Sequence, residues 1–348
     1  MTEREPKLLL FHAPLLRQAM TTPKAMRDVI YALLPATGAA VWFFGLSAIL
    51  VLSASVLGAV AAEWLFGSRA AGAAGGAGRL RGRSLLDGSG LLTGLLLGLT
   101  LPPGLPLWMA FLGGFVGITL GKLIWGGLGQ NLFNPALLGR AFLLATFPIA
   151  MTTWVPAAAG TGLTDLYPGS LALPFMQSGI DGVTAATPLG LMKFEQQATP
   201  LAALAFGNTG GSLGETSGLL LLLGGLYLWL RRDLDWRIPV GILLTVASFS
   251  FCLGLFDAGR FPAPLFSVFS GGLLLGAIYM ATDPVTSPVT PKGAWVFGVG
   301  VGLLVMLIRV FGGLPEGVMY AILLMNAATP LIDRYTQPRV FGHGVGPE

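Results

Sequence analysis

The chain has 348 residues, of which 54% are hydrophobic and only 10% are charged, with a formal net charge of +4. A soluble domain carries about 25% charged residues, so this composition excludes an ordinary soluble protein and predicts an all-α polytopic membrane protein. The small net charge gives no indication of nucleic-acid binding. A single cysteine, Cys252, and two histidines near opposite ends exclude a disulfide framework and a cysteine- or histidine-based metal centre within the chain.

Apolar runs near the ~20 residues that a bilayer requires predict about ten transmembrane helices. A polar N-terminal segment, 1–25, precedes five of them within 26–153, and a long polar loop, 154–217, follows. Five more lie within 218–332, before a tail at 333–348. The predicted spans are 26–45, 47–66, 85–101, 105–124, 135–153, 218–231, 237–256, 262–281, 293–311 and 315–332.

The distribution of lysine and arginine predicts the orientation of these spans. Basic residues gather before the first span, in the linker 68–83 and around 231–237, all on one side of the predicted topology. The positive-inside rule places this side, and both termini, in the cytoplasm. The loop 154–217 then faces outward. Five spans on each side of the loop suggest two halves of inverted topology, as in many transporters.

The outer loop contains one segment rich in hydroxyl, carboxylate and small residues, Asp181–Gly190, which reads DGVTAATPLG. One interpretation is an Asx turn that leads into a capped helix. Hydrolysis is not favoured, because a threonine hydroxyl is a poor nucleophile and the segment has no nearby histidine base. A hydroxyl that another enzyme modifies needs only exposure, small neighbours and a defined turn, which Gly182, Ala185 and Ala186 would supply.

Two further polar segments lie at membrane boundaries. The segment 129–140 enters the fifth span with Asn131, Asn134 and Arg140, and the segment 279–288 leaves the eighth with Thr282 and Asp283. A capped helix start and a proline-containing turn explain them structurally, and Arg140 could extend its side chain to the interface. A ligand or ion site is the alternative in each case. The spans contain no continuous series of titratable residues.

The motif from Asp181 to Thr187 resembles the flavinylation motif of the membrane subunits of Rnf and sodium-pumping NADH:quinone reductase complexes. This resemblance implies FMN bound covalently to Thr187 through a phosphoester, installed by a flavin transferase. Asp181, Gly182, Thr184, Ala185 and Pro188 form the rest of the implied attachment site. Thr184-Ala185 stands where many members have Ser-Gly, a change that keeps a hydroxyl and a small residue.

The resemblance covers nearly the whole chain, whose length is closer to the D-type Rnf subunits than to the longer B-type subunits of the quinone reductase. It implies a bacterial inner-membrane complex, with A-, B-, C-, E- and G-type partner subunits, that couples electron transfer between NADH and ferredoxin to Na⁺ or H⁺ movement. Some members carry a second, non-covalent flavin such as riboflavin. We hypothesise that this second flavin, or the path of the transported ion, is bound by five polar residues: Asn131, Asn134, Arg140, Thr282 and Asp283.

Three other functions stay open on sequence alone. The chain could be a B-type subunit of a quinone reductase, or a structural scaffold of a membrane assembly. It could also be a secondary transporter or channel in which the outer loop forms a lid, since ten spans and glycine-rich helices fit that class equally well.

Overall fold

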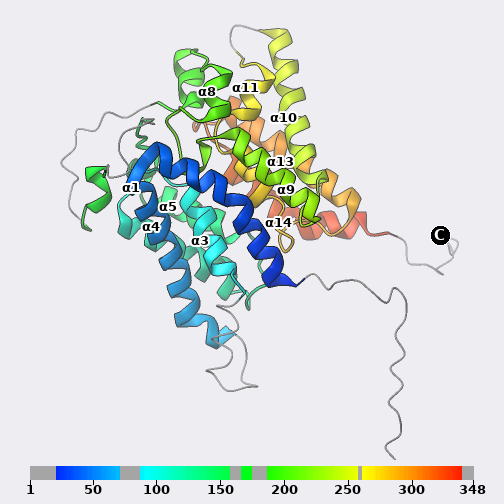
Figure 1. Cartoon of the computed structure of the whole chain (residues 1–348). Coiled ribbons are helices and arrows are strands. Elements are labelled where there is room, and N and C mark those ends of the chain that lie inside the picture. The colour runs from blue at the N-terminus through cyan, green and yellow to red at the C-terminus, as the bar shows by residue number, and fades with distance from the viewer. Residues whose placement is uncertain (1–20, 71–86, 157–165, 175–185, 258–260, 339–348) are drawn as a thin grey trace, which may run out of the picture.

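The computed structural model describes residues 21–70, 87–156, 166–174, 186–257 and 261–338. All regular secondary structure in these ranges is helical (Figure 1), which confirms the predicted all-α class. Three helical segments are long and apolar enough to cross a membrane: Thr22–Phe66, Arg237–Phe256 and Pro291–Phe311. The number of membrane crossings and the side on which each terminus lies stay predictions.

The first group of helices begins with α1 (Thr22–Ala70), which contains both of the first two predicted spans. The helix breaks at Gly45, where φ is 61°, a backbone conformation that glycine adopts without steric cost. The remaining helices of this group are α3 (Ser89–Leu99), α4 (Leu107–Ile118) with the π-helical turn η1 (Thr119–Leu123), α5 (Pro135–Thr146) and α6 (Pro148–Thr152).

Small residues let α1, α3 and α4 approach closely. A Cβ atom on Gly94 of α3 would lie 2.5 Å from the Cα of Val56, and one on Gly114 of α4 would lie 2.2 Å from the carbonyl oxygen of Ser55. The Ser55 hydroxyl donates a hydrogen bond to the Gly94 carbonyl at 2.9 Å. Helices that pack in lipid rely on such close contacts, because no hydrophobic force drives them together.

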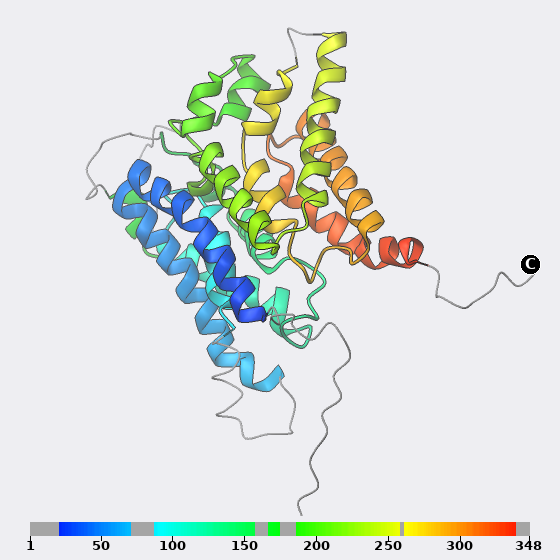
Figure 2. The ribbon, with the colours of Figure 1, turned by 45° about the vertical axis from the view of Figure 1, so that its right-hand side comes forward.

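The second group consists of α9 (Gly218–Arg231), α10 (Arg237–Phe256), α11 (Pro264–Phe269), α12 (Leu273–Leu275) with η5 (Gly276–Met280), α13 (Pro291–Phe311) and α14 (Val318–Thr336). The predicted span 262–281 is interrupted between α11 and α12, where Gly271 has a φ of 66°. Figures 1 and 2 show this group beside the first, with α9 against α1 and α14 against α5.

Short elements connect the two groups: η2 (Pro168–Leu171), α7 (Pro188–Gly190) with η3 (Leu191–Glu195), α8 (Leu201–Phe206) and η4 (Leu213–Glu215). The last of these packs inside the bundle, because Leu213 is fully buried and its N–H donates to the carbonyl of Leu101 at 3.1 Å. Helix α3 has 11 residues. Its length of about 16 Å is roughly half of the ~30 Å hydrocarbon layer. The last part of the predicted outer loop, η4, therefore lies against the C-terminal end of α3, a helix of about half the length needed to cross the bilayer.

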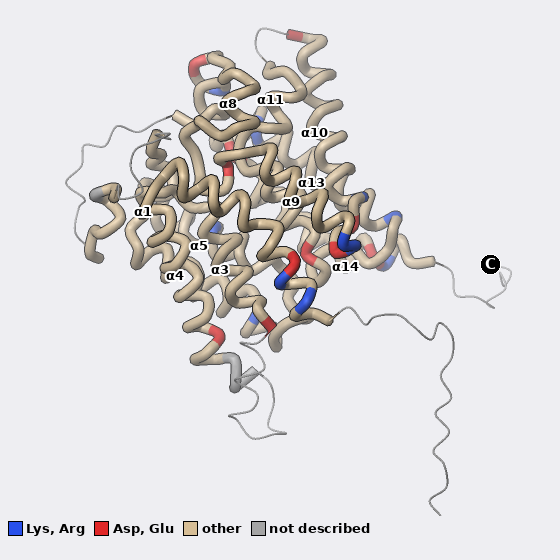
Figure 3. The backbone as a smooth tube through the Cα atoms, viewed as in Figure 1, with Lys and Arg blue, Asp and Glu red and all other residues tan. Residues whose placement is uncertain are grey.

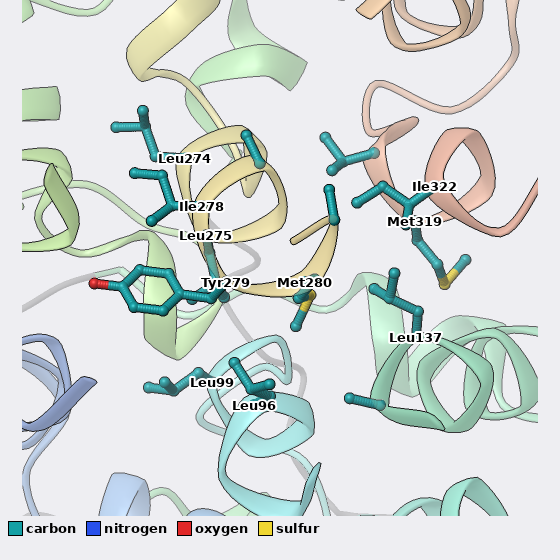
Figure 4. Close-up of a cluster of buried hydrophobic side chains, with 14 of the residues drawn as sticks. Leu96, Leu99, Leu137, Leu274, Leu275, Ile278, Tyr279, Met280, Met319 and Ile322 are labelled. Carbon is teal, nitrogen blue, oxygen red and sulfur yellow. The ribbon is translucent and has the colours of Figure 1, made fainter. Parts of the chain in front are cut away.

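The centre of the bundle is apolar. Figure 4 shows side chains from α3, α5, α12–η5 and α14 that point toward one another, and all are buried: Leu96, Leu99, Leu137, Leu274, Leu275, Ile278, Tyr279, Met280, Met319 and Ile322. This set is called the central apolar cluster below. Most charged positions lie near helix ends and turns (Figure 3).

Candidate functional site

Thr187 lies at the start of a continuous helical segment, Pro188–Glu195, formed by α7 and η3. Its side-chain oxygen accepts a hydrogen bond from the N–H of Gly190 at 3.1 Å, and Pro188 occupies the first helical position. This is the capped helix that one interpretation of the segment expected. Asp181, Gly182, Thr184 and Ala185 lie outside the described residues.

The sequence predicted an exposed hydroxyl at Thr187, but the structure buries this side chain. Its relative exposure is 5%, whereas Ala186 before it is exposed. The capping bond directs the hydroxyl toward the first turn of α7.

The helical segment that Thr187 caps is fixed to the second group of helices by two side chains. Leu189 is buried, and its Cδ1 lies 2.6 Å from the position of a Cβ on Gly271. The Lys193 amino group donates to the carbonyl of Arg309 at 2.9 Å, and also to those of Gly312 and Leu314. Lys193 thus supplies a hydrogen-bond donor to carbonyl groups at the end of α13 that have no partner within the helix. Burial lowers the pKa of its amino group.

A cavity of about 100 Å³ lies among α1, α3, α5, α9 and η5. We call it the amide cavity, since two of its lining residues are Asn131 and Asn134. Thr282 and Asp283 also line it, so the structure brings together four of the five residues proposed for a second flavin or an ion path. Apolar side chains, among them Leu92 and Leu228, form much of the remaining wall.

Three of these four residues form hydrogen bonds at helix ends; those of Asn134 join α5 to η5, whereas those of Thr282 and Asp283 are local. Asn134 caps α5 by accepting from the N–H groups of Ala136 and Leu137, and its amide donates to the carbonyl of Met280 at 3.0 Å. The Thr282 hydroxyl donates to the carbonyl of Ile278 at 2.6 Å. Asp283 accepts from Val285 N–H and the Thr286 hydroxyl in a turn, and burial raises the pKa of its carboxyl.

Two other side chains at the amide cavity have polar atoms that are inaccessible to solvent and lack a hydrogen-bond partner. They are the amide oxygen of Asn131 and both carboxylate oxygens of Asp233. Desolvation, followed by a hydrogen bond with the Asp28 carboxylate, raises the pKa of Asp233, so a protonated Asp233 can donate to Asp28. Buried polar atoms of native proteins are normally satisfied, so the Asn131 oxygen is the strongest indication of a ligand or ordered water in this cavity. No sequence signal distinguishes Asp233, because it follows two arginines in an ordinary turn.

Arg140 lies apart from the other four predicted residues. Its guanidinium forms an ion pair with Glu316 at 2.6 Å, with side-chain exposures of 12% and 19%. Both residues line a second cavity of about 40 Å³, which Arg309 also lines and which we call the arginine cavity. Arg309 donates to the carbonyls of Ser267 at 2.6 Å and Ser270 at 3.0 Å, and so caps the interrupted end of α11.

The fold and these sites define a class: an α-helical membrane protein with interrupted helices, internal polar cavities and a capped threonine on a connecting segment. Residues 10–342 match the model of the NQR2, RnfD, RnfE family, and the chain belongs to this family.

Relatives of known name agree with that assignment. The chain is 42% identical to the D-type subunit of the proton-translocating ferredoxin:NAD(+) oxidoreductase complex of Clostridium ljungdahlii, over 95% of both chains. It is 44% identical to the D-type subunit of the ion-translocating oxidoreductase complex of Stutzerimonas stutzeri, over 92% of both chains. It is 39% identical to the protein of the same name from Halorhodospira halophila, over 96% of this chain and 95% of that one.

Proposed function

We propose that this chain is the D-type membrane subunit of an Rnf-type complex, which couples electron transfer between NADH and ferredoxin to ion movement. The support is family membership over residues 10–342 and relatives of that name that align over nearly their entire length. The catalytic activity belongs to the assembled complex with its A-, B-, C-, E- and G-type subunits. This chain contributes a carrier site within the membrane.

The observation that carries the proposal is the position of Thr187 at the N-terminus of the segment Pro188–Glu195. A phosphoester on its oxygen would place negative charge where a helix end presents free N–H groups and a partial positive charge. The N–H of Gly190 already points at this oxygen. Pro188 contributes no N–H, so the donors that would meet a phosphoryl group are the N–H groups of Leu189 and Gly190.

FMN held at Thr187 would supply one-electron transfer. The chain's own residues determine where that carrier sits. Lys193 fixes the helical segment to the end of α13, and Leu189 anchors it against Gly271. A single covalent attachment at the helix start then keeps the carrier at one place while its redox state changes.

The amide cavity is the proposed site of a second, non-covalent flavin such as riboflavin. The unpartnered oxygens of Asn131 and Asp233 would accept hydrogen bonds from ring or hydroxyl donors. Leu92, Leu96 and Ile278 would cover an aromatic face. Asn134, Thr282 and Asp283 would shape this site through the hydrogen bonds that they form at helix ends.

The topology forms part of the same proposal. Ten membrane crossings, cytoplasmic termini and a periplasmic Thr187 segment place the two flavin sites toward opposite faces of the inner membrane. Arg231 and Lys122 lie at the end of the bundle that holds the amide cavity, and this fits a cytoplasmic location for that end. The transported ion is Na⁺ or H⁺.

The test is in-gel fluorescence of the denatured subunit under ultraviolet light, after expression in a host that has the flavin transferase. The wild-type band should fluoresce and Thr187→Ala should be dark. Thr199→Ala, which changes a nearby threonine on the same connecting segment, should retain the fluorescence. A dark wild-type band in that host would overturn the proposed carrier site.

A further inference from the structure

Glu215 lies between the C-terminal end of α3 and the start of α12. It ends η4, whose Leu213 N–H bonds to Leu101 at the end of α3. A Cβ on Gly214 would lie 2.9 Å from both the Leu99 carbonyl oxygen and the Leu275 side chain. The segment therefore fits between the C-terminal end of α3 and the start of α12–η5 only because residue 214 has no side chain.

The Glu215 carboxylate lies against the backbone of two glycines. Its Oε1 is 3.3 Å from the position of a Cβ on Gly272, the residue that begins α12–η5, and its Oε2 is 2.7 Å from that of a Cβ on Gly211. The start of a helix favours a negative charge. The Oε1 atom is nevertheless inaccessible to solvent and has no hydrogen-bond partner. The Glu215 side chain is thus half-buried, and one of its two oxygens is both inaccessible and unsatisfied.

The charged groups near Glu215 are already engaged. Arg140 pairs with Glu316, and the guanidinium of Arg309 donates to two backbone carbonyls through its terminal nitrogens, which leaves only its Nε without a partner. Glu316 adds a like charge that opposes ionisation of Glu215. Negative charge added nearby therefore favours protonation of this carboxylate.

Two buried hydroxyls beside these elements also lack partners. Ser212 lies beside the Glu215 carboxylate and is 1% exposed, but the geometry of its hydroxyl does not meet the limits of a hydrogen bond. Ser270, next to Gly271, is fully buried. The arginine cavity reaches this place, because Gly272, which contacts Glu215, is one of its lining residues. A cavity of about 40 Å³ has room for about three or four waters, each of which needs roughly 10–15 Å³. Hydroxyls and water can pass a proton to a carboxyl.

A short chain of contacts links Glu215 to the proposed carrier site. Leu189, two residues after Thr187, packs against Gly271, and the adjacent Gly272 contacts the Glu215 carboxylate. Charge that arrives at Thr187 would therefore act on Glu215 through an interior of low dielectric constant, where electrostatic effects are strong.

We propose that Glu215 is a redox-linked proton-binding site of this subunit. With an electron on the carrier at Thr187, the carboxylate would take up one proton from the solvent, relayed by water and hydroxyls at the arginine cavity, and would release it by the same route when the electron leaves. The O–H bond of Glu215 is the only bond formed or broken in this chain. The inference rests on the proposed function, because the electron must come from the carrier at Thr187.

The first test is redox-difference infrared spectroscopy of the intact complex. Reduction should produce a carboxylic-acid carbonyl band that shifts in D₂O, is lost in Glu215→Gln and persists in Glu195→Gln, an exposed carboxyl on η3. Ion movement per electron should fall at least tenfold in Glu215→Gln and recover in part in Glu215→Asp. An unchanged band in Glu215→Gln, or no carboxyl band in wild type, would overturn the inference.

A second test requires no variant. Dicyclohexylcarbodiimide reacts with protonated carboxyls in apolar surroundings, so mass spectrometry of the reduced wild-type complex should find it on Glu215. Glu63, which is paired with Lys122, should stay unmodified. Labelling should decrease as pH rises and should not change with Na⁺ at constant pH. No labelling of Glu215, or protection by Na⁺, would overturn a proton site.

The in-gel fluorescence of the same sample separates the two proposals. A subunit that carries covalent flavin but shows no Glu215 band contradicts only the proton site. A subunit without covalent flavin contradicts the proposed carrier site, and the redox link of Glu215 with it.

Discussion

The amide cavity and the arginine cavity lie on opposite sides of the central apolar cluster, and their polar side chains are engaged to different degrees. Leu96, Ile278 and Tyr279 line the first cavity, while Leu137, Leu275 and Met280 line the second; Figure 4 shows all six side chains. At the amide cavity, the oxygens of Asn131 and Asp233 lack partners. At the arginine cavity, Arg140 and Glu316 pair with each other and Arg309 donates to the backbone, although the Nε of Arg309 lacks a partner.

This difference separates residues that hold the fold from residues that are free to bind. An internal bond contributes to stability, and its loss leaves a buried partner unsatisfied. An unpartnered buried atom has nothing to lose within the protein, so its replacement should affect binding and leave stability nearly unchanged. The substitutions below test that distinction in order of expected effect.

Arg140→Met should produce the largest loss of stability. It leaves the carboxylate of Glu316 largely buried without its partner, at a cost of about 3 kcal/mol in the free energy of unfolding. The measurement is denaturant-induced unfolding in detergent. The double variant Arg140→Met/Glu316→Gln removes the unpaired charge and should recover most of the loss. A single variant as stable as the double would show that the pair is not structural.

Asn134 and Asn131 line one cavity and should nevertheless respond differently to the same change. Asn134→Leu removes the cap of α5 and the bond to Met280, for a loss of about 2 kcal/mol. Asn131→Leu should alter stability by less than about 0.5 kcal/mol, because its oxygen is unpartnered. It should lower the non-covalent flavin content instead. Acid extraction and chromatography of flavin from each variant, beside the unfolding curve, measures both effects.

Much of the helical framework could be predicted from sequence because lipid imposes a simple rule of apolar length. The predicted spans 218–231 and 237–256 coincide with α9 and α10. Asn134-Pro135 also predicted the start of α5 correctly. The interruption at Gly271 was missed, since a glycine among apolar residues looks the same whether it packs or breaks a helix.

The contacts between distant segments could not be predicted at all. The ion pair of Arg140 with Glu316 joins residues 176 positions apart. The same holds for Glu215, which appears in the sequence as one acid of a polar loop and lies in the structure between two helix ends. Periodicity and composition describe single elements, whereas these sites arise only where elements meet.

Lys193→Met tests whether the helical segment after Thr187 is held in place by the end of α13. Three carbonyls lose their charged donor, with an expected local loss of about 1 kcal/mol. Hydrogen exchange should accelerate over 188–195 and stay unchanged in α3. Covalent flavin should form at an altered rate, because Thr187 caps this segment. Lys292→Met, at the start of α13, serves as the control; unchanged exchange in Lys193→Met would show that this anchor is not structural.

The smallest effect is expected at Asp233, and it should appear only in the pH dependence of stability. Burial and the neighbouring Asp28 raise the pKa of Asp233, whereas Arg231 and Lys24 oppose the shift. The folded protein therefore keeps a proton on Asp233 at pH values where the unfolded chain has lost it, above the ordinary value of about 4. In that range the unfolded state binds fewer protons, so stability must fall as pH rises through the raised pKa.

Asp233→Asn removes the titrating group and should flatten this fall, so the stability difference between variant and wild type should grow with pH. Unfolding curves across the acidic to neutral range measure it, with Asp235→Asn on the same turn as the control. Parallel curves for wild type and Asp233→Asn would mean that a ligand or water already satisfies Asp233. The carboxyl would then belong with the internally bonded side chains of the arginine cavity, and the contrast between the two cavities would rest on Asn131 alone.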